Sequence, residues 1–201
     1  QLRHLIEQHP LNQVKKQEIR LERIYDYPLV KVAFASDPLF KKLLEPTVVG
    51  EDHLLPEQWL EGARSVISYF LPFSEAVREA NRIEGWPALE WLYARFEGEE
   101  FNNLVRRYLE EAFQSEGYGA VAPVLDNRFK ISQYRSNWSE RHVAYIAGLG
   151  TFSLSRSLIT EKGCAGRYGS VVVTAELTPS ERAYSGREDY CNLCGQCIER
   201  C

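Results

Sequence analysis

Four cysteines lie close together at the C-terminal end of the chain and constrain it more than any other feature. They are Cys191, Cys194, Cys197 and Cys201, spaced as C-x2-C-x2-C-x3-C. Cubane iron–sulfur clusters need several thiolates that converge from one tight loop, and this spacing supplies them. Structural zinc sites usually take two C-x2-C pairs separated by an intervening segment. The run therefore predicts a 4Fe–4S cluster in preference to zinc.

The fourth ligand of that cluster is open to two interpretations. In two-cluster ferredoxin modules the fourth cysteine of such a run binds the other cluster. A second run would then lie beyond Cys201, or else Cys201 or Cys164 completes a single cluster. We favour two clusters, and we expect a segment of a longer protein because the chain begins at Gln1 and contains no methionine. Cys164 is interpreted as a small packed thiol.

Composition narrows the class of protein. The chain has 201 residues, 44% hydrophobic and 26% charged, which is typical of a globular protein. Its net charge of −4 supplies no basic field for nucleic acid or an anionic membrane. No apolar stretch is long enough to cross a bilayer. An odd number of cysteines, with four crowded together, argues against a secreted disulfide framework, so we expect a cytoplasmic protein.

Strands and helices alternate along the chain. Apolar runs predict strands over residues 29–35, 65–71, 120–122 and 170–177. Helices are predicted for 12–25 (exposed), from Asp37 and Pro38 onward, for 89–96 and 101–113, and for 138–147. The pattern predicts an α/β (α+β) domain over residues 1–178, with a linker and the cysteine segment over 179–201.

The helix expected over 138–147 carries the most informative polar residues. We interpret Asn137 as its cap, Glu140 as the partner in a capping box, and Gly148 as its end. Arg141 and His142 recur with aromatic residues at helical spacing, which fits a pocket wall and an ordinary packing interface equally well. The amides of the following turn are candidates for holding a cofactor phosphate or amide, although such a turn has a purely structural reading too. The turn residues are Gly148, Gly150, Thr151 and Ser155.

Other polar residues receive plainer interpretations. Arg106 is assigned to a solvated helix face. Arg167 is assigned to the surface, with an anion contact as the sharper alternative. His53 lies in a polar context and receives no function.

The stretch from Ser136 to Thr160 resembles the epoxyqueuosine reductase family, whose members carry a comparable helix ending in Ala-Gly-Leu-Gly before a ferredoxin module. Residues 56–68 and 119–123 are also similar, so the resemblance covers most of 29–201. It implies a nitroreductase-like core sheet with flanking helices, followed by the beginning of a ferredoxin-like module with two 4Fe–4S clusters. It also implies bound cobalamin, as in the related corrinoid reductive dehalogenases, with the clusters delivering electrons to cobalt.

The resemblance also implies site residues. The family's catalytic aspartate falls near Tyr134 in this sequence, and the nearest acid, Asp126, lies eight residues earlier. A tyrosine hydroxyl can donate a proton, so Tyr134 and Asp126 are the catalytic candidates. The candidates for binding the cofactor are Gly148, Gly150, Thr151, Ser155, Arg141 and His142.

Two functions from different classes are compatible with these features. The first is a cobalamin-dependent iron–sulfur reductase of a small organic substrate or modified nucleoside, supplied by a redox electron donor. It predicts a cavity bounded by residues near 120–160 and open towards the cysteines. The second is a non-catalytic iron–sulfur electron carrier or docking protein without corrinoid, which predicts a filled or shallow pocket. Transfer RNA is a third candidate partner through the family, but the net negative charge gives it no support.

Overall fold

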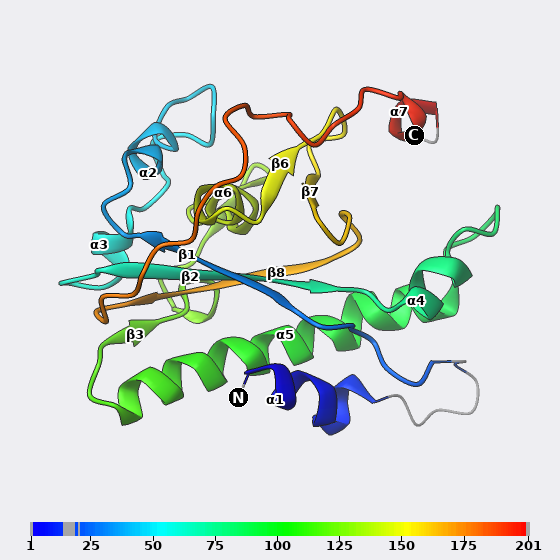
Figure 1. Ribbon diagram of the computed structural model, residues 1–201, viewed down its shortest axis with the longest axis horizontal. Coiled ribbons are helices and arrows are strands. Elements are labelled where there is room, and N and C mark those ends of the chain that lie inside the picture. The colour runs from blue at the N-terminus through cyan, green and yellow to red at the C-terminus, as the bar shows by residue number, and fades with distance from the viewer. Residues whose placement is uncertain (1, 14–18, 20, 200–201) are drawn as a thin grey trace.

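A four-stranded antiparallel sheet forms the centre of the molecule (Figure 1). The structure, a computed structural model, describes residues 2–13, 19 and 21–199. The strand order is β1 (Leu29–Phe34), β2 (Ser65–Pro72), β8 (Gly166–Val173) and β3 (Ala120–Val121). All four predicted strands are confirmed, although β8 begins four residues earlier than expected and residues 174–177 leave the sheet.

Helices cover both faces of this sheet. The long helix α5 (Leu89–Ser115) lies along one face, together with α1 (Leu2–Gln8), and α4 (Glu75–Ala80) packs near its start (Figure 1). On the opposite face lie α6 (Glu140–Ala147) and α2 (Pro38–Lys42), with α3 (Pro56–Trp59) nearby. The sheet is therefore buried on both sides, which explains why its central strands read as continuous apolar runs.

The side chains of β2 show how the two layers share the sheet. Every residue of β2 is buried. Ile67, Tyr69 and Leu71 join the core cluster on the α5 side, while Val66 joins the cluster on the α6 side. This alternation follows from the two-residue period of a strand.

Short elements complete the fold. Two hairpins, β4–β5 (Ile131–Ser132 and Arg135–Ser136) and β6–β7 (Gly150–Phe152 and Leu158–Thr160), flank α6 in the sequence. The remaining elements are η1 (Pro10–Asn12), η2 (Pro123–Leu125) and α7 (Gln196–Glu199). Among the described residues, no helix has the combination of length and apolarity that a bilayer crossing requires.

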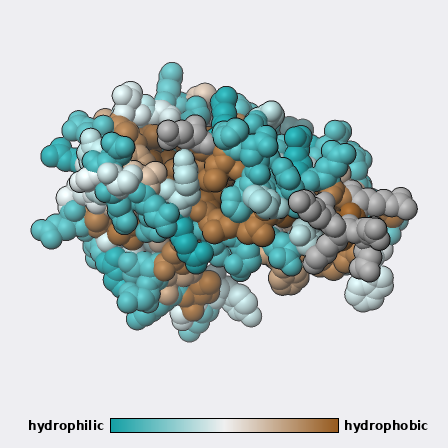
Figure 2. Space-filling view, turned by 90° about the horizontal axis from the view of Figure 1, so that it is seen from below, coloured by the Kyte–Doolittle hydropathy of each residue, from teal (hydrophilic) through white to brown (hydrophobic). Residues whose placement is uncertain are grey.

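Two predicted helical regions differ from the structure. The separate helices expected over 89–96 and 101–113 are one continuous helix, α5. Its predicted stripe of Leu89, Leu92 and Phe96 is largely exposed, and Figure 2 shows apolar side chains among hydrophilic ones on the face seen from below. The exposed helix expected over 12–25 is wrong for its described part, which contains no α-helix and buries Leu21 and Ile24. Residues 14–18 and 20 of that prediction lie outside the described residues.

Candidate functional site

A polar network covers the outer edge of β8. The short β3 pairs only with Val172 and Val173, so within the described chain the rest of that edge has no strand partner. Two side chains of α5 bind there instead: Asn102 Nδ2 and Arg106 Nη2 each donate to the carbonyl of Tyr168 at 3.0 Å. Because buried backbone carbonyls need hydrogen-bond partners, side chains of α5 act in place of a neighbouring strand.

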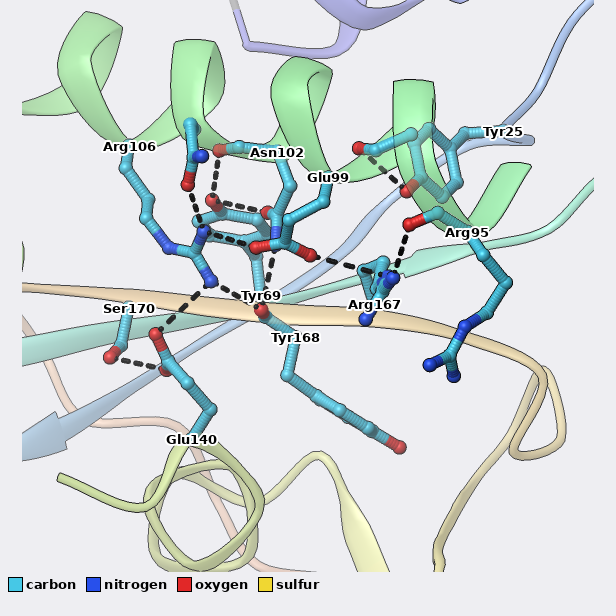
Figure 3. A network of polar contacts seen from close by, with 12 residues as sticks. Tyr25, Tyr69, Arg95, Glu99, Asn102, Arg106, Glu140, Arg167, Tyr168 and Ser170 are labelled. Atoms are coloured by element: carbon cyan, nitrogen blue, oxygen red, sulfur yellow. Dashed lines mark hydrogen bonds and ion pairs between the residues drawn. The ribbon is translucent and has the colours of Figure 1, made fainter. Parts of the chain in front are cut away.

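Arg106 connects the two helical layers around this edge (Figure 3). Its side chain is only 3% exposed, and Nη1 donates to Glu99 Oε1 at 2.8 Å. Nη2 also lies 3.5 Å from Glu140 Oε1, which belongs to α6 on the opposite face of the sheet. Burial opposes the charged form of Arg106, but Glu140, Tyr69 and Glu99 raise its pKa overall, so the guanidinium stays cationic. The assignment of Arg106 to a solvated helix face is wrong.

Glu140 faces the sheet, and the predicted capping box is wrong. Ser170 Oγ donates to Glu140 Oε2 at 2.6 Å, and Trp138 Nε1 donates to Ser170 Oγ at 2.9 Å. Ser139, not Asn137, is the N-cap of α6. Burial raises the pKa of Glu140, while Arg106 and the bond from Ser170 act in the opposite direction. The Glu140 side chain, which is 15% exposed, lies between α6 and β8.

Tyr69 belongs to the same network and contacts it from the face of the sheet that α5 covers. Its hydroxyl donates to Asn102 Oδ1 at 2.8 Å, and burial raises its pKa well above the ordinary value. Gly169 lies opposite Tyr69 in the ladder, and a Cβ there would come within 2.2 Å of the Tyr69 hydroxyl oxygen. Glycine at 169 therefore makes the room that Tyr69 occupies.

The network forms one wall of a cleft of about 640 Å³, here called the network cleft. Arg95, Glu99 and Arg106 reach it from α5, and Glu140 and Arg141 reach it from α6. Further lining residues include Phe129, Ile131, Leu158, Cys164 and Arg167. Cys164 is exposed, so its interpretation as a packed thiol is wrong. Arg167 is partly buried with Nε 3.2 Å from Glu99 Oε2, so the plain surface position is wrong. Contact with a bound anion stays a prediction.

A second cleft of about 330 Å³, here called the helix cleft, lies on the other side of Arg141. Arg141 lines both clefts, so the two adjoin. His142 Nδ1 lies 2.7 Å from Ser139 Oγ, and its ring lies 4.9 Å from that of Phe152. Burial, with a contribution from Arg141, lowers the pKa of His142 to about 4, so the ring is neutral near pH 7. His142 therefore fits both interpretations of the predicted helix face, because its ring is hydrogen-bonded in place and also lines the helix cleft.

The segment that leads to the cysteines is hydrogen-bonded beside the helix cleft. Phe152 N donates to the carbonyl of Arg187 at 2.8 Å, and Tyr190 N donates to Thr151 Oγ1 at 2.8 Å. Arg187 and Glu188 line the cleft, and Cys191 N donates to the Glu188 carbonyl at 2.9 Å. The first cysteine of the run is therefore held three residues from the cleft wall.

Most of the predicted turn residues contact neighbouring backbone. A Cβ at Gly148 would lie 3.0 Å from the carbonyl oxygen of Glu181, and one at Gly150 would lie 1.9 Å from that of Ile159. Thr151 holds Tyr190, and Ser155 is exposed with its hydroxyl 2.9 Å from that of Ser153. The structure thus brings Arg141 and His142 to the helix cleft and places the other four around the adjoining turn. Cofactor binding by these six residues stays a prediction.

The two catalytic candidates lie apart from both clefts. Tyr134 is fully exposed at the tip of the β4–β5 hairpin, with φ 64°. Asp126 Oδ2 lies 2.7 Å from Arg128 Nη2, and the hydrogen bond from Arg128 lowers the pKa of Asp126. Neither residue lines the network cleft or the helix cleft. Their catalytic role stays a prediction.

A third cleft, of about 780 Å³, lies between the 49–54 loop and the β4–β5 hairpin. It is lined by polar residues that include Asp52, Arg128 and Arg135. His53 also lines it although the side chain is almost fully buried, with Nε2 accepting from Ser139 N at 3.3 Å. Burial, together with the charge of His142, lowers the pKa of His53 to about 4. The polar context expected for His53 holds for the cleft that it lines, although its own side chain is almost fully buried.

The cysteine run has the donor chemistry of a cluster site, but its three described cysteines do not form a metal site in the structure. Cys191 is half-buried, and Cys194 and Cys197 are exposed. Leu193 (φ 55°) and Gly195 (φ 78°) curl the chain between them. Among residues 2–13, 19 and 21–199, no three histidines, cysteines or acids converge on one metal position, and Cys201 lies outside these residues. Thiolates at this spacing fit an iron–sulfur cluster in donor type.

Sequence reasoning missed the network, although a signal for it exists. Asn102 and Arg106 lie four residues apart in the helix predicted over 101–113, and Glu99 lies three residues before Asn102, between the two predicted helices. Such a polar stripe ordinarily reads as a solvated face. It faces inward here because β8 offers an unpaired edge and α6 offers Glu140, which the spacing alone does not reveal.

The fold is that of two classes of reductase, the epoxyqueuosine reductases and the reductive dehalogenases. Epoxyqueuosine reductase from Streptococcus thermophilus matches 86% of this chain with 17% identity and a TM-score of 0.51. The enzyme from Bacillus subtilis matches 85% with 16% identity and a TM-score of 0.50. The catabolic reductive dehalogenase NpRdhA matches 86% with 17% identity and a TM-score of 0.53. No family model and no curated protein matches the sequence.

The chain spans about half the length of these epoxyqueuosine reductases, 48% and 47%, and 22% of the dehalogenase. The predicted fold class, a mixed α/β domain with an antiparallel sheet and flanking helices, is confirmed. The predicted resemblance is likewise confirmed as a likeness of fold.

Proposed function

We propose that this chain is the corrinoid-binding, electron-receiving part of a cobalamin-dependent iron–sulfur reductase. One observation carries the proposal: the segment before the cysteines is hydrogen-bonded to β6 beside the helix cleft. Electron transfer to a cofactor requires its source to be held near the acceptor. Thr151 and the amide of Phe152 supply that attachment through Tyr190 and Arg187.

The helix cleft fits part of a large amphipathic cofactor. Its floor is apolar, with Leu43, Ile146 and Phe152, and its rim carries cationic side chains. The cationic residues are Lys42, Arg141, Arg156 and Arg187. Cobalamin has an apolar ring surface, amide groups and a phosphate, and it supplies a redox-active cobalt when bound. Arg141 and His142 would hold it, with the neutral His142 ring offering a hydrogen bond without a charge.

The cysteine run fits the electron source. Cys191, Cys194 and Cys197 would bind an iron–sulfur cluster, which supplies electrons one at a time. The known relatives support this assignment: they are reductases by name, and a reductive dehalogenase among them is described in terms of B12-dependent dehalogenation. Clefts of about 640 and 330 Å³ favour a reductase over a pure electron carrier, for which a filled or shallow pocket is expected.

Tyr134 remains the proposed proton donor, with Asp126 as the alternative. The B. subtilis epoxyqueuosine reductase is described with its catalytic loop swung out of the active site. An exposed hairpin with Tyr134 at its tip is compatible with a loop of that kind. Asp126 is the weaker candidate because Arg128 keeps it ionised. In this proposal the substrate occupies the network cleft and the corrinoid the helix cleft, with Arg141 between them.

The proposal is tested by anaerobic purification of the full-length protein supplied with cobalamin, followed by metal analysis and an absorption spectrum. We expect stoichiometric cobalt with about eight irons, the content of two 4Fe–4S clusters. Cys194→Ala should lower iron, whereas Cys164→Ala, which removes a thiol outside the run, should not. Arg141→Ala should lower cobalt, whereas Arg107→Ala on the exposed face of α5 should not. Iron without cobalt, and no spectral change on adding cobalamin, would leave an iron–sulfur electron carrier.

A further inference from the structure

The network cleft carries more positive than negative charge. Two cations, Arg106 and Arg167, are matched by the carboxylates of Glu99 and Glu140. Arg95 and Arg141 also line the cleft and add two positive charges that no lining carboxylate matches. A partly enclosed surface with surplus cations attracts anions, because the low-dielectric walls focus the field.

Arg95 is the cation best placed to meet an anion. Its guanidinium makes no hydrogen bond or ion pair with any other described residue, and Figure 3 shows no dashed line to it. Its backbone carbonyl accepts a hydrogen bond from Arg167 Nη2, which ties this turn of α5 to β8. The charged end of Arg95 is therefore uncommitted while its backbone is fixed.

Arg106 gives a second indication that polar groups around this cleft lack partners. Its Nε is buried and has no hydrogen-bond partner in the described part of the chain, although the rest of its guanidinium is fully bonded. Buried donors without partners are rare in folded proteins.

The other side of the cleft is apolar. Phe129 and Ile131 line it, and Ile131 is 72% exposed although it belongs to a short strand. An exposed aliphatic side chain at the mouth of a cleft gains free energy when a ligand covers it. The lining therefore favours a molecule with an acidic group and an apolar body over a free inorganic ion.

We propose that the network cleft binds a small organic anion, with its carboxylate at Arg95 and Arg141 and its apolar body against Phe129 and Ile131. This inference rests on the proposed function only in naming the cleft as the substrate site. It narrows the substrate class to carboxylate-bearing organic molecules of low molecular mass, as opposed to a transfer RNA stem, whose many phosphates need a broad basic surface.

The test uses three probes with the full-length protein: benzoate, its neutral isostere benzamide, and inorganic phosphate. Titration calorimetry at low salt should show saturable binding of benzoate at least tenfold tighter than of either other probe. Benzamide keeps the ring and removes the charge, and phosphate keeps the charge and removes the ring. Equal affinity for benzoate and benzamide would overturn the role of the cations, and equal affinity for benzoate and phosphate would overturn the role of the apolar wall.

Two variants on the same helix supply a matched comparison. Arg95→Gln should weaken benzoate binding by about tenfold, the effect expected for losing one charge-assisted hydrogen bond, and leave benzamide unchanged. Arg107→Gln changes an exposed arginine of α5 that lines no part of the cleft and should leave both affinities unchanged. Equal losses in the two variants, or no saturable benzoate binding to the parent protein, would overturn the proposal.

Cobalt content separates this test from that of the proposed function. Arg95 does not line the helix cleft, so Arg95→Gln should bind cobalamin as the parent does. Benzoate binding without any cobalt uptake would refute the corrinoid reductase and leave the anion site standing. Normal cobalt uptake without benzoate binding would refute the anion site alone.

Discussion

Arg106 shows how a single buried side chain can connect several elements of a fold. It is bonded to Glu99, to the Tyr168 carbonyl and to Glu140, which come from three different elements. Removing one member of a buried ion pair leaves the others uncompensated, which typically costs about 3–5 kcal/mol. We therefore expect Arg106→Met to lower the free energy of unfolding by about that amount, measured by urea denaturation.

Arg107→Met is the control for that change. It alters the neighbouring residue of the same helix, is exposed, and should change the free energy of unfolding by no more than about 0.5 kcal/mol. Adding Glu140→Leu to Arg106→Met should restore part of the loss, because the unpaired carboxylate is then gone. Similar stabilities for the two arginine variants would contradict the assigned role of Arg106.

The two buried histidines predict how stability depends on pH. Burial lowers the pKa of both His53 and His142 to about 4, below the value of about 6.5 expected in the unfolded chain. Between these values the unfolded state binds more protons than the folded state. The contribution of the two histidines to the free energy of unfolding is therefore constant above about pH 6.5 and falls as the pH drops towards 4. At pH 5 the loss should be roughly 2 kcal/mol per histidine.

Comparison with a double variant isolates this effect. Glu140 acts in the opposite direction, since its raised pKa means that acidification relieves the cost of burying its charge. The difference between the parent and His53→Gln/His142→Gln, followed by urea denaturation from pH 7.5 to 5, removes that common contribution. The parent should lose more stability than the variant over this range, and parallel curves would contradict the prediction.

At the scale of elements, the sequence best predicts the strands and helices whose buried residues match their pattern of apolar residues. The strand β2 is buried throughout and follows from its apolar run, and Gly148, with φ 97°, ends α6 as expected. The strand β1 is confirmed as a strand, although only one of its residues is buried. The break expected within α5 is wrong because Gly98, which weakens a helix locally, is fixed by tertiary contact: the Tyr25 hydroxyl donates to its carbonyl at 2.9 Å. Whether a helix continues through a glycine thus depends on contacts with residues that are distant in sequence, and a local sequence pattern holds no information on these contacts.

Gly169 offers a test of how β8 and β2 fit together. A Cβ there would collide with the Tyr69 hydroxyl, which must then leave Asn102. We expect Gly169→Ala to lower the free energy of unfolding by about 1–3 kcal/mol, the usual cost of overpacking. In a double-mutant cycle with Tyr69→Leu, the alanine should cost clearly less than in the parent, because the collision is absent. Additive effects in the cycle would show that Tyr69 is not the obstacle.

At the scale of the whole molecule, the sequence predicted which segments contain the candidate residues better than it predicted the contacts of those residues. Arg141 and His142, which belong to the 136–160 stretch, line a cleft. Their role in cofactor binding, and that of the cysteine run in holding a cluster, stay predictions. The turn after α6 holds the linker instead of forming a cleft wall, since Gly150 lies against β7 and Thr151 against Tyr190. The packing of the linker against the domain depends on contacts between distant segments, which spacing within one motif does not encode.

That packing leads to a prediction about how the cysteine segment is positioned. Thr151 is fully buried, and its hydroxyl accepts from the amide of Tyr190 directly before Cys191. Thr151→Val keeps the shape of the side chain but removes the acceptor, which costs about 1 kcal/mol in local stability. Hydrogen exchange at the Tyr190 and Cys191 amides should then become roughly fivefold faster, because these amides open with the linker.

Ser155→Ala is the matched control, since it removes an exposed hydroxyl of the same β6–β7 hairpin that does not contact the linker. It should leave exchange at Tyr190 unchanged. Under the proposed function, Thr151→Val in the full-length protein should also slow electron delivery to the cofactor while iron content stays the same, because only the position of the cysteine segment changes. Unchanged exchange in Thr151→Val would mean that the linker is held by its other contacts, chiefly those of Arg187 and Tyr184, and that the Thr151 bond does not position Cys191.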